Sequence, residues 1–364
     1  MKKLLFATCC IAFLSGSLGA AAQKKSAAKN VLTQTLKGKS WSADNGNGTF
    51  TNPLFYDEFS DPDIIRVGED YYLAGTTMHS VPGLVVLHSK DLVNWEFSSY
   101  CFDRFDDSDD FNLRNGKEAY GQGIWAPAIR YHNGKFYIFS NINGHGLQVY
   151  ISDSAKGPWT HHKVNGDIYD LSVLFDEDGK IYAVHKYGNV TVTELKPDLS
   201  GPVEGSSKVV IPEGNAMGEG HHVYKINGMY YILSADYSPM GRMQCARSKS
   251  IWGPYETCVI SERESYGYAA GWSVGNMGIG RPLPEDGFSF QNNKPNGLNL
   301  GCATIHQGGI VQAPDGKWWG VSMQDFNAVG RTVCLSPVTW VDGWPYFGLE
   351  KNLGRSPRTW FKPN

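Results

Sequence analysis

The sequence lacks the features that mark several large classes of protein. Basic residues are not in excess, because 33 Lys and Arg face 36 Asp and Glu, and the net charge of −3 argues against nucleic acid as a partner. No apolar run is long enough to cross a membrane. No segment repeats its apolar residues with helical periodicity. We therefore expect a helix-poor protein without a membrane span.

Cysteines are few and follow no recognisable pattern. Of the seven, two lie in an apolar segment at the N-terminus, and the other five are widely spaced: Cys101, Cys245, Cys258, Cys302 and Cys334. An odd number at such spacings is not a disulfide framework, and without a Cys-x-x-Cys pair there is no zinc pattern. One or two disulfide bonds are possible, and no pairing is favoured.

The N-terminus is typical of a signal peptide. Lys2 and Lys3 precede an apolar stretch that ends in small residues at 19–22. We interpret residues 1–22 as the signal peptide, 23–50 as a polar leader segment and 51–364 as one domain. The protein is expected to be exported, either to the periplasm or out of the cell.

Aromatic residues, at 13%, and glycine, with 42 residues, are abundant and occur in a repeat. The unit is a turn with Gly, then two ring or apolar residues, then a short apolar strand. Five copies are present, with turns at Gly68, Gly134, Gly179, Gly228 and Gly316. Four of these turns read Asn-Gly or Asp-Gly, the strongest short signal for a β-hairpin.

The spacing of the repeats predicts a β-propeller. Tyr137, Tyr182 and Tyr231 occupy the same place in consecutive copies, 45 and 49 residues apart, which is close to the length of a four-stranded blade. The five copies predict an all-β fold, a five-bladed β-propeller, with two stacked β-sandwiches as the alternative. The spacing is longer between the first two copies and between the last two, which predicts loops over residues 101–120 and roughly 260–300. Long loops on a rigid scaffold often shape a site.

Acidic residues precede the turns at matching places in the repeats. In a propeller, the strand before each turn is the innermost of its blade. The residues at the start of these strands are Asp61, Trp125, Asp170, Glu219 and His306. Pro62 is expected to hold the residue before it in an extended conformation. Three carboxylates that converge at one end of a channel raise one another's proton affinity, which separates an acid from a base and matches the chemistry of glycoside hydrolysis.

The motifs around these residues carry a family resemblance. They are Phe59-Ser-Asp-Pro-Asp-Ile-Ile-Arg, Trp125-Ala-Pro-Ala-Ile-Arg, Asp170-Leu-Ser-Val-Leu-Phe, Glu219-Gly-His-His-Val-Tyr, His306-Gln-Gly-Gly-Ile-Val and Gly330-Arg331-Thr. In this order and spacing they resemble glycoside hydrolase family 43, over about residues 52 to 345. The resemblance implies a five-bladed propeller and an inverting enzyme that acts on xylose- or arabinose-containing polymers.

Carried over by motif, the resemblance implies roles for the three carboxylates. Asp61 would be the general base that activates water, and Glu219 the general acid that protonates the leaving oxygen. Asp170 would orient Glu219 and tune its pKa. In an inverting enzyme, the acid and the base stand about 6.5–9.5 Å apart to leave room for the water.

Binding residues and an ion are implied as well. Trp125 and His79 would form walls of the substrate pocket, and Arg331 would contact sugar hydroxyls; core packing is the alternative for Trp125 and an ordinary salt bridge for Arg331. His306 resembles a channel histidine near a structural calcium or sodium ion. Because such ions prefer oxygen ligands, it would act through water, and a buried hydrogen-bonded histidine is the equal alternative. No cofactor is expected for the chemistry.

The sequence departs from the family pattern in two places. Leu171 stands where the family usually has proline, which loosens the expected pose of the neighbouring Asp170. Relatives often continue into a second β-sandwich domain beyond the position of Asn364, so we expect a substrate pocket that is more open or differently closed.

The sequence leaves several functions open. The first is an exo-acting β-xylosidase or α-L-arabinofuranosidase with an oligosaccharide or polysaccharide substrate, acting as a monomer. An endo-acting arabinanase or xylanase and a non-catalytic carbohydrate-binding propeller are the alternatives. A fructan-active propeller enzyme is a weaker one, because that class opens with an Asn-Asp-Pro-Asn type motif where this chain has Ser60-Asp61-Pro62-Asp63.

Overall fold

The computed structural model describes residues 42–105, 108–215, 217–236, 242–261, 307–325, 330–348 and 359–363. The chain divides into Met1–Ser42 and a compact unit, Ala43–Asn364. The described residues form strands and turns without a helix, and so without one that could span a membrane. The predicted signal peptide, the loop near 260–300 and His306 lie outside the described residues.

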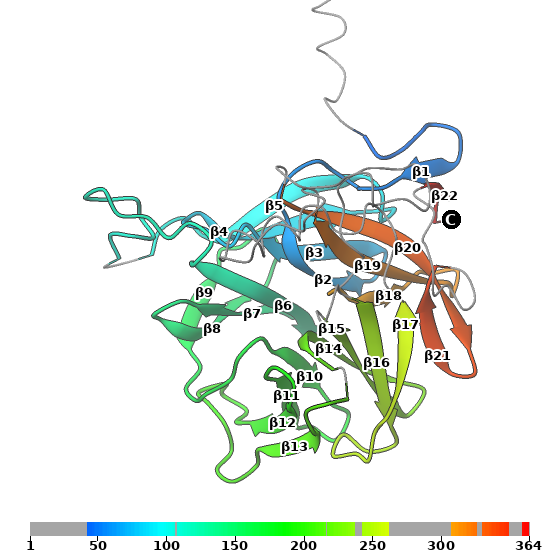
Figure 1. The fold of residues 1–364 in the computed structure, drawn as a ribbon. Coiled ribbons are helices and arrows are strands. Elements are labelled where there is room, and N and C mark those ends of the chain that lie inside the picture. The colour runs from blue at the N-terminus through cyan, green and yellow to red at the C-terminus, as the bar shows by residue number, and fades with distance from the viewer. Residues whose placement is uncertain are drawn as a thin grey trace, which may run out of the picture. The chain divides into compact units, whose positions relative to one another are not determined.

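Twenty of the strands build five four-stranded antiparallel sheets, and the predicted five-bladed β-propeller is confirmed (Figure 1). Blade 1 contains β2 (Ser60–Val67), β3 (Asp70–Thr76), β4 (Gly83–Ser89) and β5 (Trp95–Phe102). Blade 2 contains β6 (Ile124–His132), β7 (Lys135–Ile142), β8 (Gly146–Ser152) and β9 (Thr160–Lys163). Blade 3 contains β10 (Ser172–Phe175), β11 (Ile181–His185), β12 (Val190–Leu195) and β13 (Lys208–Ile211).

Blade 4 contains β14 (Glu219–Ile226), β15 (Met229–Asp236), β16 (Arg242–Ser248) and β17 (Glu256–Ser261). Blade 5 contains β18 (Ile310–Gln312), β19 (Trp318–Asp325), β20 (Arg331–Val341) and β21 (Trp344–Phe347). The first strands of neighbouring blades lie against one another, as β2 does with β6 and with β18. These first strands therefore line the centre of the propeller.

The repeat seen in the sequence is the hairpin between the first two strands of each blade. In blade 2, Asn133 and Gly134 have φ values of 48° and 79°, as the mirror-image turns of tight hairpins require. The aromatic residues that follow the turns pack between blades. Tyr72 of β3, for example, meets Phe136 of β7 edge-on, with ring centroids 4.9 Å apart. One short motif thus encodes both the turn and the contact to the next blade.

Apolar clusters fill the spaces between neighbouring blades. The cluster between blades 1 and 2 includes Val86 and Ile129, both completely buried. The cluster that closes the ring combines Leu73 of blade 1 with Val321 of blade 5, again completely buried. Burial of one such side chain stabilises the fold by about 1.5–3 kcal/mol. The blades are therefore held in sequence around the ring mainly by apolar packing.

The first strands of three blades are irregular where they begin. The pairing of β2 shifts register between Ser60 and Asp63, and that of β14 between Glu219 and His222. The pairing of β6 shifts in the same way between Ile124 and Pro127. A β-bulge leaves residues without a cross-strand partner and redirects their side chains. The same device thus recurs at the same end of three blades.

The expectation of an extended backbone at Asp61 was wrong. Asp61 lies inside the β2 bulge and has a φ of 52°, in the left-handed region. Pro62 disfavours the right-handed helical region for the residue before it, and Asp tolerates the left-handed one better than most residues. Asp170, at 51°, and Gln307, at 45°, adopt the same conformation before β10 and β18. Such residues cost about 1–3 kcal/mol each and gather at functional sites.

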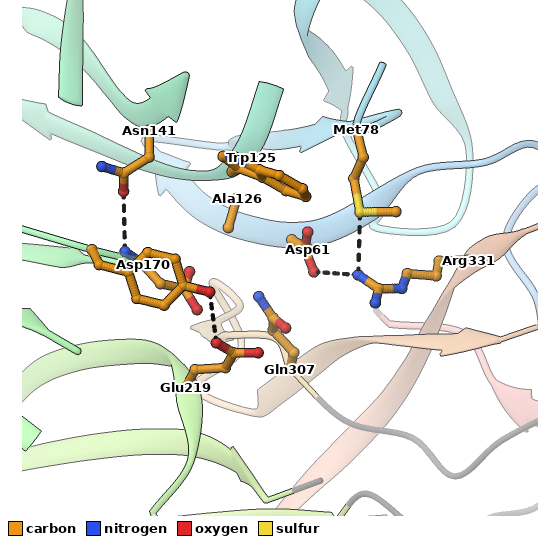
Figure 2. A pocket seen from close by; sticks show the side chains of 10 residues that line it. Asp61, Met78, Trp125, Ala126, Asn141, Asp170, Glu219, Gln307 and Arg331 are labelled. Carbon is orange, nitrogen blue, oxygen red and sulfur yellow. Dashed lines mark hydrogen bonds and ion pairs between the residues drawn. The ribbon is translucent and has the colours of Figure 1, made fainter. Parts of the chain in front are cut away.

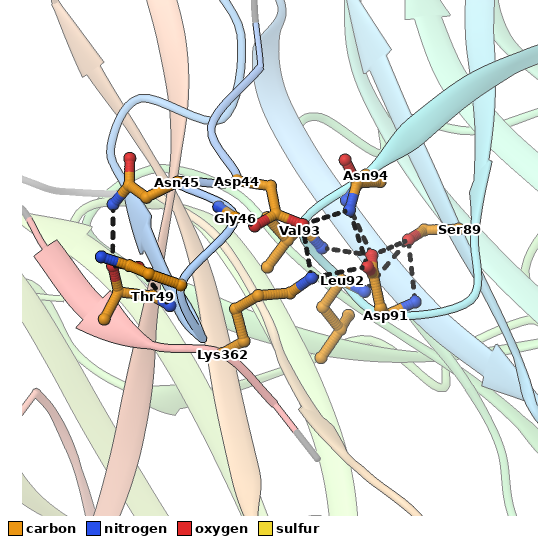
Figure 3. Close-up of polar contacts among 11 residues, drawn as sticks. Asp44, Asn45, Gly46, Thr49, Ser89, Asp91, Leu92, Val93, Asn94 and Lys362 are labelled. Atoms are coloured by element: carbon orange, nitrogen blue, oxygen red, sulfur yellow. Dashed lines mark hydrogen bonds and ion pairs between the residues drawn. The ribbon is translucent and has the colours of Figure 1, made fainter.

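A small sheet and a polar cluster join the ends of the compact unit to blade 1. Strand β1 (Thr49–Thr51) pairs with β22 (Thr359–Phe361). Lys362 Nζ lies 2.6 Å from Asp44 Oδ2 and 3.4 Å from Asp91 Oδ2 (Figure 3). Residues 43–50, which the sequence assigned to the leader, take part here, and Phe50 is completely buried. We call this group of Asp44, Asp91 and Lys362 the terminal clasp.

Candidate active site

A pocket of about 120 Å³ opens where the first strands of the blades begin. All three carboxylates predicted from the sequence line it, as do Trp125 and Arg331 (Figure 2). The other lining residues are Met78, Ala126, Asn141, Tyr169 and Gln307. Each of the five blades supplies at least one side chain, so the pocket lies on the axis of the propeller.

Asp61 forms one wall together with a residue of blade 5. Arg331, the first residue of β20, donates from Nη1 to Asp61 Oδ1 at 3.1 Å and to Ser60 Oγ at 3.0 Å. Only 6% of Asp61 is exposed, so its carboxylate has little freedom to turn away. In Figure 2, Asp61 and Arg331 lie on one side of the pocket and Asp170 and Glu219 on the other.

Asp170 and Glu219 form the opposite wall. Gly220 N donates to Asp170 Oδ2 at 2.7 Å, and Tyr169 Oη donates to Glu219 Oε2 at 2.8 Å. Burial and the charges of Glu219 and Asp61 raise the pKa of Asp170 to about 8. Burial and the Asp61 charge also raise the pKa of Glu219, against the lowering effect of the Tyr169 hydrogen bond. The pair therefore retains a proton at neutral pH.

The backbone around this pair is fixed by two neighbours. Asn141 near the end of β7 accepts a hydrogen bond from Asp170 N at 3.0 Å and donates to Ile168 O at 2.8 Å. Gly220 has a φ of 64°, and a Cβ there would lie 2.5 Å from the side chain of Gln307. The Glu-Gly pair of the blade 4 motif is thus required for Glu219 and Gln307 to face the same pocket.

A buried polar cluster lies further along the first strands, centred on Asp63. Asp63 Oδ2 accepts from Ile129 N at 2.9 Å and from Arg130 Nη1 at 2.5 Å. Asp63 Oδ1 accepts from Ile64 N and contacts His222 Nδ1, both at 3.0 Å. Burial opposes ionisation of Asp63, but the charges of Arg130 and His222 outweigh it and lower its pKa to about 2. The carboxylate is therefore ionised and fully satisfied.

The cluster reaches the remaining blades through hydroxyl groups. Arg130 also donates to Ser172 Oγ of blade 3, which accepts from Val223 N of blade 4 at 3.0 Å. Tyr224 Oη of blade 4 accepts from Ile310 N of blade 5 at 2.9 Å. These contacts join all five blades two to five residues beyond the side chains of the pocket. We call this group the Asp63 cluster.

One of the predicted substrate-binding residues, His79, does not line this pocket. His79 lines a second cavity, where its Nδ1 accepts from Gly121 N at 2.8 Å and its Nε2 lies 3.0 Å from Glu58 Oε2. His306 lies outside the described residues. The sequence analysis did not identify Tyr169, Asn141 and Met78 as pocket residues, although their positions in the chain could have indicated them. Met78 and Asn141 lie where the second strands return to the pocket, and Tyr169 adjoins Asp170.

The described residues do not fit a metal ion. They contain no group of three or more His, Cys, Asp or Glu side chains that could hold one. Both oxygens of Asp63 already accept hydrogen bonds and face the Arg130 guanidinium, so the Asp63 cluster offers no oxygen to calcium or sodium. The ion implied by His306 stays a prediction about residues that the structure does not describe.

The fold and the pocket together define a class of protein: a five-bladed propeller with a carboxylate-lined pocket on its axis. The sequence profile of Glycosyl hydrolases family 43 matches residues 50–267, and the chain therefore belongs to this family.

Relatives of known name agree with this assignment. The non-reducing end alpha-L-arabinofuranosidase BoGH43B of Bacteroides ovatus is 34% identical, with the match covering 87% of this chain and 56% of the relative. The beta-xylosidase of Formosa agariphila is 29% identical, over 94% of this chain and 58% of the relative. The chain thus spans little more than half the length of these curated relatives.

Solved structures give the same family. The bifunctional GH43-CE protein of Bacteroides eggerthii has a TM-score of 0.70 at 33% identity, over 86% of this chain and 37% of that one. The GH43 protein BlXynB of Bacillus licheniformis has a TM-score of 0.66 at 28% identity, over 87% of this chain and 59% of that one.

Proposed function

We propose that the protein is an exported, inverting glycoside hydrolase that removes xylose or arabinose from the ends of plant polysaccharide chains or their oligosaccharides. The observation that carries the proposal is the convergence of Asp61, Asp170 and Glu219, from three blades, in one pocket. Glycoside hydrolysis requires an acid and a base that flank the bond to be broken. Export is proposed from the signal-peptide pattern of residues 1–22.

Each carboxylate has a task that its surroundings support. Asp61, oriented by Arg331, acts as the base that takes a proton from the attacking water. Glu219, whose pKa is raised by burial and the Asp61 charge, protonates the leaving oxygen. Asp170, beside it, keeps a proton in the pocket and holds the turn that carries Glu219 through Gly220 N. Acid and base of this kind contribute about 10²–10⁴-fold each to the rate, and the chemistry needs no cofactor.

The size of the pocket favours release of a single terminal sugar. A volume of about 120 Å³ is below the roughly 300–1,000 Å³ of sites for drug-sized ligands. The space that the described residues leave beside Trp125 has about the size of one small ring, which favours removal of a terminal sugar over internal attack on a long chain. The named relatives are an arabinofuranosidase and a xylosidase, which supports xylose or arabinose as that ring.

The test is release of 4-nitrophenol from the β-xyloside and from the α-L-arabinofuranoside. The wild type should hydrolyse at least one. Glu219→Gln should lower the rate by roughly 10²–10⁴-fold on oligosaccharides, whose leaving sugar needs a proton, and by less on the nitrophenyl glycosides, whose leaving group is acidic. Glu204→Gln is the matched control, because Glu204 is exposed in blade 3 and away from the pocket. A wild type that is inactive on both glycosides and on xylan and arabinan would contradict the proposal.

A further inference from the structure

The aspartates that open blades 1 and 3 share one backbone conformation but differ in the residue that follows. Asp61 and Asp170 have φ values of 52° and 51°, in the left-handed region that few residues adopt. In blade 1 the next residue is Pro62, which disfavours the right-handed helical region for Asp61. In blade 3 the next residue is Leu171, which leaves that region open to Asp170. The left-handed backbone of Asp170 therefore needs another cause.

Strand pairing also holds the two aspartates differently. Strand β2 begins at Ser60, so its pairs with β3 lie on both sides of Asp61. Strand β10 begins at Ser172, after Asp170, so its pairs with β11 lie on one side only. Asp170 thus lacks both the proline and the strand pair before it that fix the backbone of Asp61.

The side chain of Asn141 contacts the backbone of blade 3 at this point. Asn141 lies within the paired part of β7 in blade 2, so its own backbone is fixed. Its Oδ1 accepts from Asp170 N at 3.0 Å, and its Nδ2 donates to Ile168 O at 2.8 Å (Figure 2). Between these two contacts, Tyr169 O accepts from Lys186 N at 2.9 Å. One amide of the neighbouring blade therefore bridges the three residues that lead into β10.

We propose that Asn141 is a positioning residue, which holds Asp170 in the left-handed conformation and so does in blade 3 what Pro62 does in blade 1. Its effect on the reaction rests on the proposed function. Asp170 Oδ2 accepts from Gly220 N at 2.7 Å, so the pose of Asp170 also sets the turn that carries Glu219. Loss of the Asn141 contacts should therefore impair the general acid before the rest of the pocket.

The test combines Asn141→Ala with Leu171→Pro. Asn141→Ala should lower kcat by about 10–100-fold on xylobiose or arabinobiose, whose leaving sugar needs a proton, because small displacements of catalytic groups are this costly. The loss should be smaller on the nitrophenyl glycoside, whose leaving group is acidic. Adding Leu171→Pro should restore most of kcat, because proline again disfavours the right-handed region for Asp170. Proline is tolerated there, since the paired residues of β10 begin only after Leu171.

Two single variants are the controls. Leu171→Pro alone should keep the wild-type kcat, although it should melt at lower temperature because Leu171 is buried. Asn52→Ala is the matched control for the loss of a bridging amide. Asn52 is buried outside the pocket, donates from Nδ2 to Leu335 O and accepts at Oδ1 from Leu335 N, both at 2.8 Å. Asn52→Ala should lower the melting temperature and leave kcat unchanged.

Three results would overturn the inference: an unchanged kcat in Asn141→Ala, a lowered kcat that Leu171→Pro does not restore, or a raised KM with an unchanged kcat, which would make Asn141 a sugar contact. Should Asn141→Ala not fold, Asn141→Ser replaces it, because its side chain is too short to bridge both backbone groups.

A wild type that hydrolyses nothing would contradict the proposed function, and crystal structures of the variants then test the positioning alone. The φ of Asp170 should leave the left-handed region in Asn141→Ala and return to it when Leu171→Pro is added. A φ that stays near 51° in Asn141→Ala would show that Asn141 does not hold this backbone.

Discussion

At the scale of the residue, the pocket depends on a proton held between Asp170 and Glu219. Both carboxyls are partly buried and lie near Asp61, so both pKa values are raised, that of Asp170 to about 8. Two interacting carboxyls lose their protons in two steps, and the apparent pKa of each step is a property of the pair. A general acid must be protonated to act, so activity should disappear as the pH rises towards 8 and the pair loses its last proton.

Asp170→Asn should move the alkaline limb of the pH profile to lower pH. The substitution removes the carboxyl whose raised pKa keeps a proton in the pocket, and Glu219 then loses its proton alone. The measurement is kcat/KM on a nitrophenyl glycoside across pH, for the wild type and the variant. Asp153→Asn, an exposed control, should keep the wild-type profile. An alkaline limb that stays in place in Asp170→Asn would refute this account of the proton.

The same substitution should stabilise the folded protein, increasingly so as the pH rises. The pKa of Asp170 is about 8 in the folded chain and about 3.8 when unperturbed, so the folded state binds the proton more tightly. The stabilisation from this proton is present below the unfolded pKa and is lost as the pH rises from about 4 to about 8. The Asn side chain does not titrate in this range, so the variant does not lose stability in this way as the pH rises. The melting temperature of Asp170→Asn should therefore exceed that of the wild type more at pH 8 than at pH 4, and an equal difference at both would contradict the argument.

The sequence could predict the three carboxylates of the pocket because the repeat marks equivalent positions. Asp61, Asp170 and Glu219 start the first strands of three blades, so alignment of the repeats brings them together. Tyr169 and Asn141 were not predicted because the sequence analysis considered only the starts of the first strands, whereas Asn141 lies near the end of a second strand and Tyr169 one residue before Asp170. The left-handed backbone of Asp61 could not be predicted from the sequence, because it arises from a β-bulge that depends on pairing with β3.

At the scale of the element, the first strands are held in position by the Asp63 cluster. Its members follow the side chains of the pocket by two to five residues, as with Asp63 after Asp61 and Ser172 after Asp170. Separate blades carry the acid and the base, so their separation depends on how these strands are joined. The cluster therefore acts on the chemistry by positioning the carboxylates, without touching the substrate.

Asp63→Asn should lower kcat by roughly 10–100-fold in protein that is still folded, because small displacements of catalytic groups are this costly. Asp176→Asn is the matched control. Asp176 is also buried and joins two blades, through Lys225 Nζ at 2.8 Å and Tyr230 Oη at 2.6 Å, but at the opposite end of β10. Both variants should melt at lower temperature, and only Asp63→Asn should lose kcat.

Equal loss of kcat in the two variants, or in neither, would count against a positioning role. Should Asp63→Asn not fold, Tyr224→Phe offers a milder change, since it removes only the hydroxyl that accepts from Ile310 N. Its kcat should fall while the KM for a nitrophenyl glycoside stays within a few-fold of the wild type. A changed KM with an unchanged kcat would be the contrary result.

At the scale of the whole unit, the ring depends on closure between its first and last blades. The sequence predicted the number of blades because the hairpin motif is local and recurs five times. It did not predict the terminal clasp, because Asp44, Asp91 and Lys362 are far apart in the chain and none belongs to the repeat. Hydrogen bonds from Lys362 and Gly46, and then Asn94, lower the pKa of Asp44 to about 2.

Lys362→Met should lower the stability of the unit by roughly 1 kcal/mol at neutral pH, since the clasp is partly exposed to water. A lowered pKa means that the stabilisation is present above the unfolded pKa of about 3.8 and is lost as the pH falls towards 2. The difference between variant and wild type in chemical denaturation should therefore vanish in acid. A difference that is as large at pH 2 as at neutral pH would show that the lost charge pair is not its cause.

In the proposed mechanism, Asp61 and Glu219 act as base and acid from opposite sides of one pocket. Proton NMR of the sugar first released from a β-xyloside or an α-L-arabinofuranoside is the decisive test of these roles. Direct attack by a water that Asp61 activates inverts the anomeric carbon, so the first product should be the α-anomer of xylose or the β-anomer of arabinose. A first product with the configuration of the substrate would contradict the claim, and would instead make a carboxylate of the pocket the nucleophile.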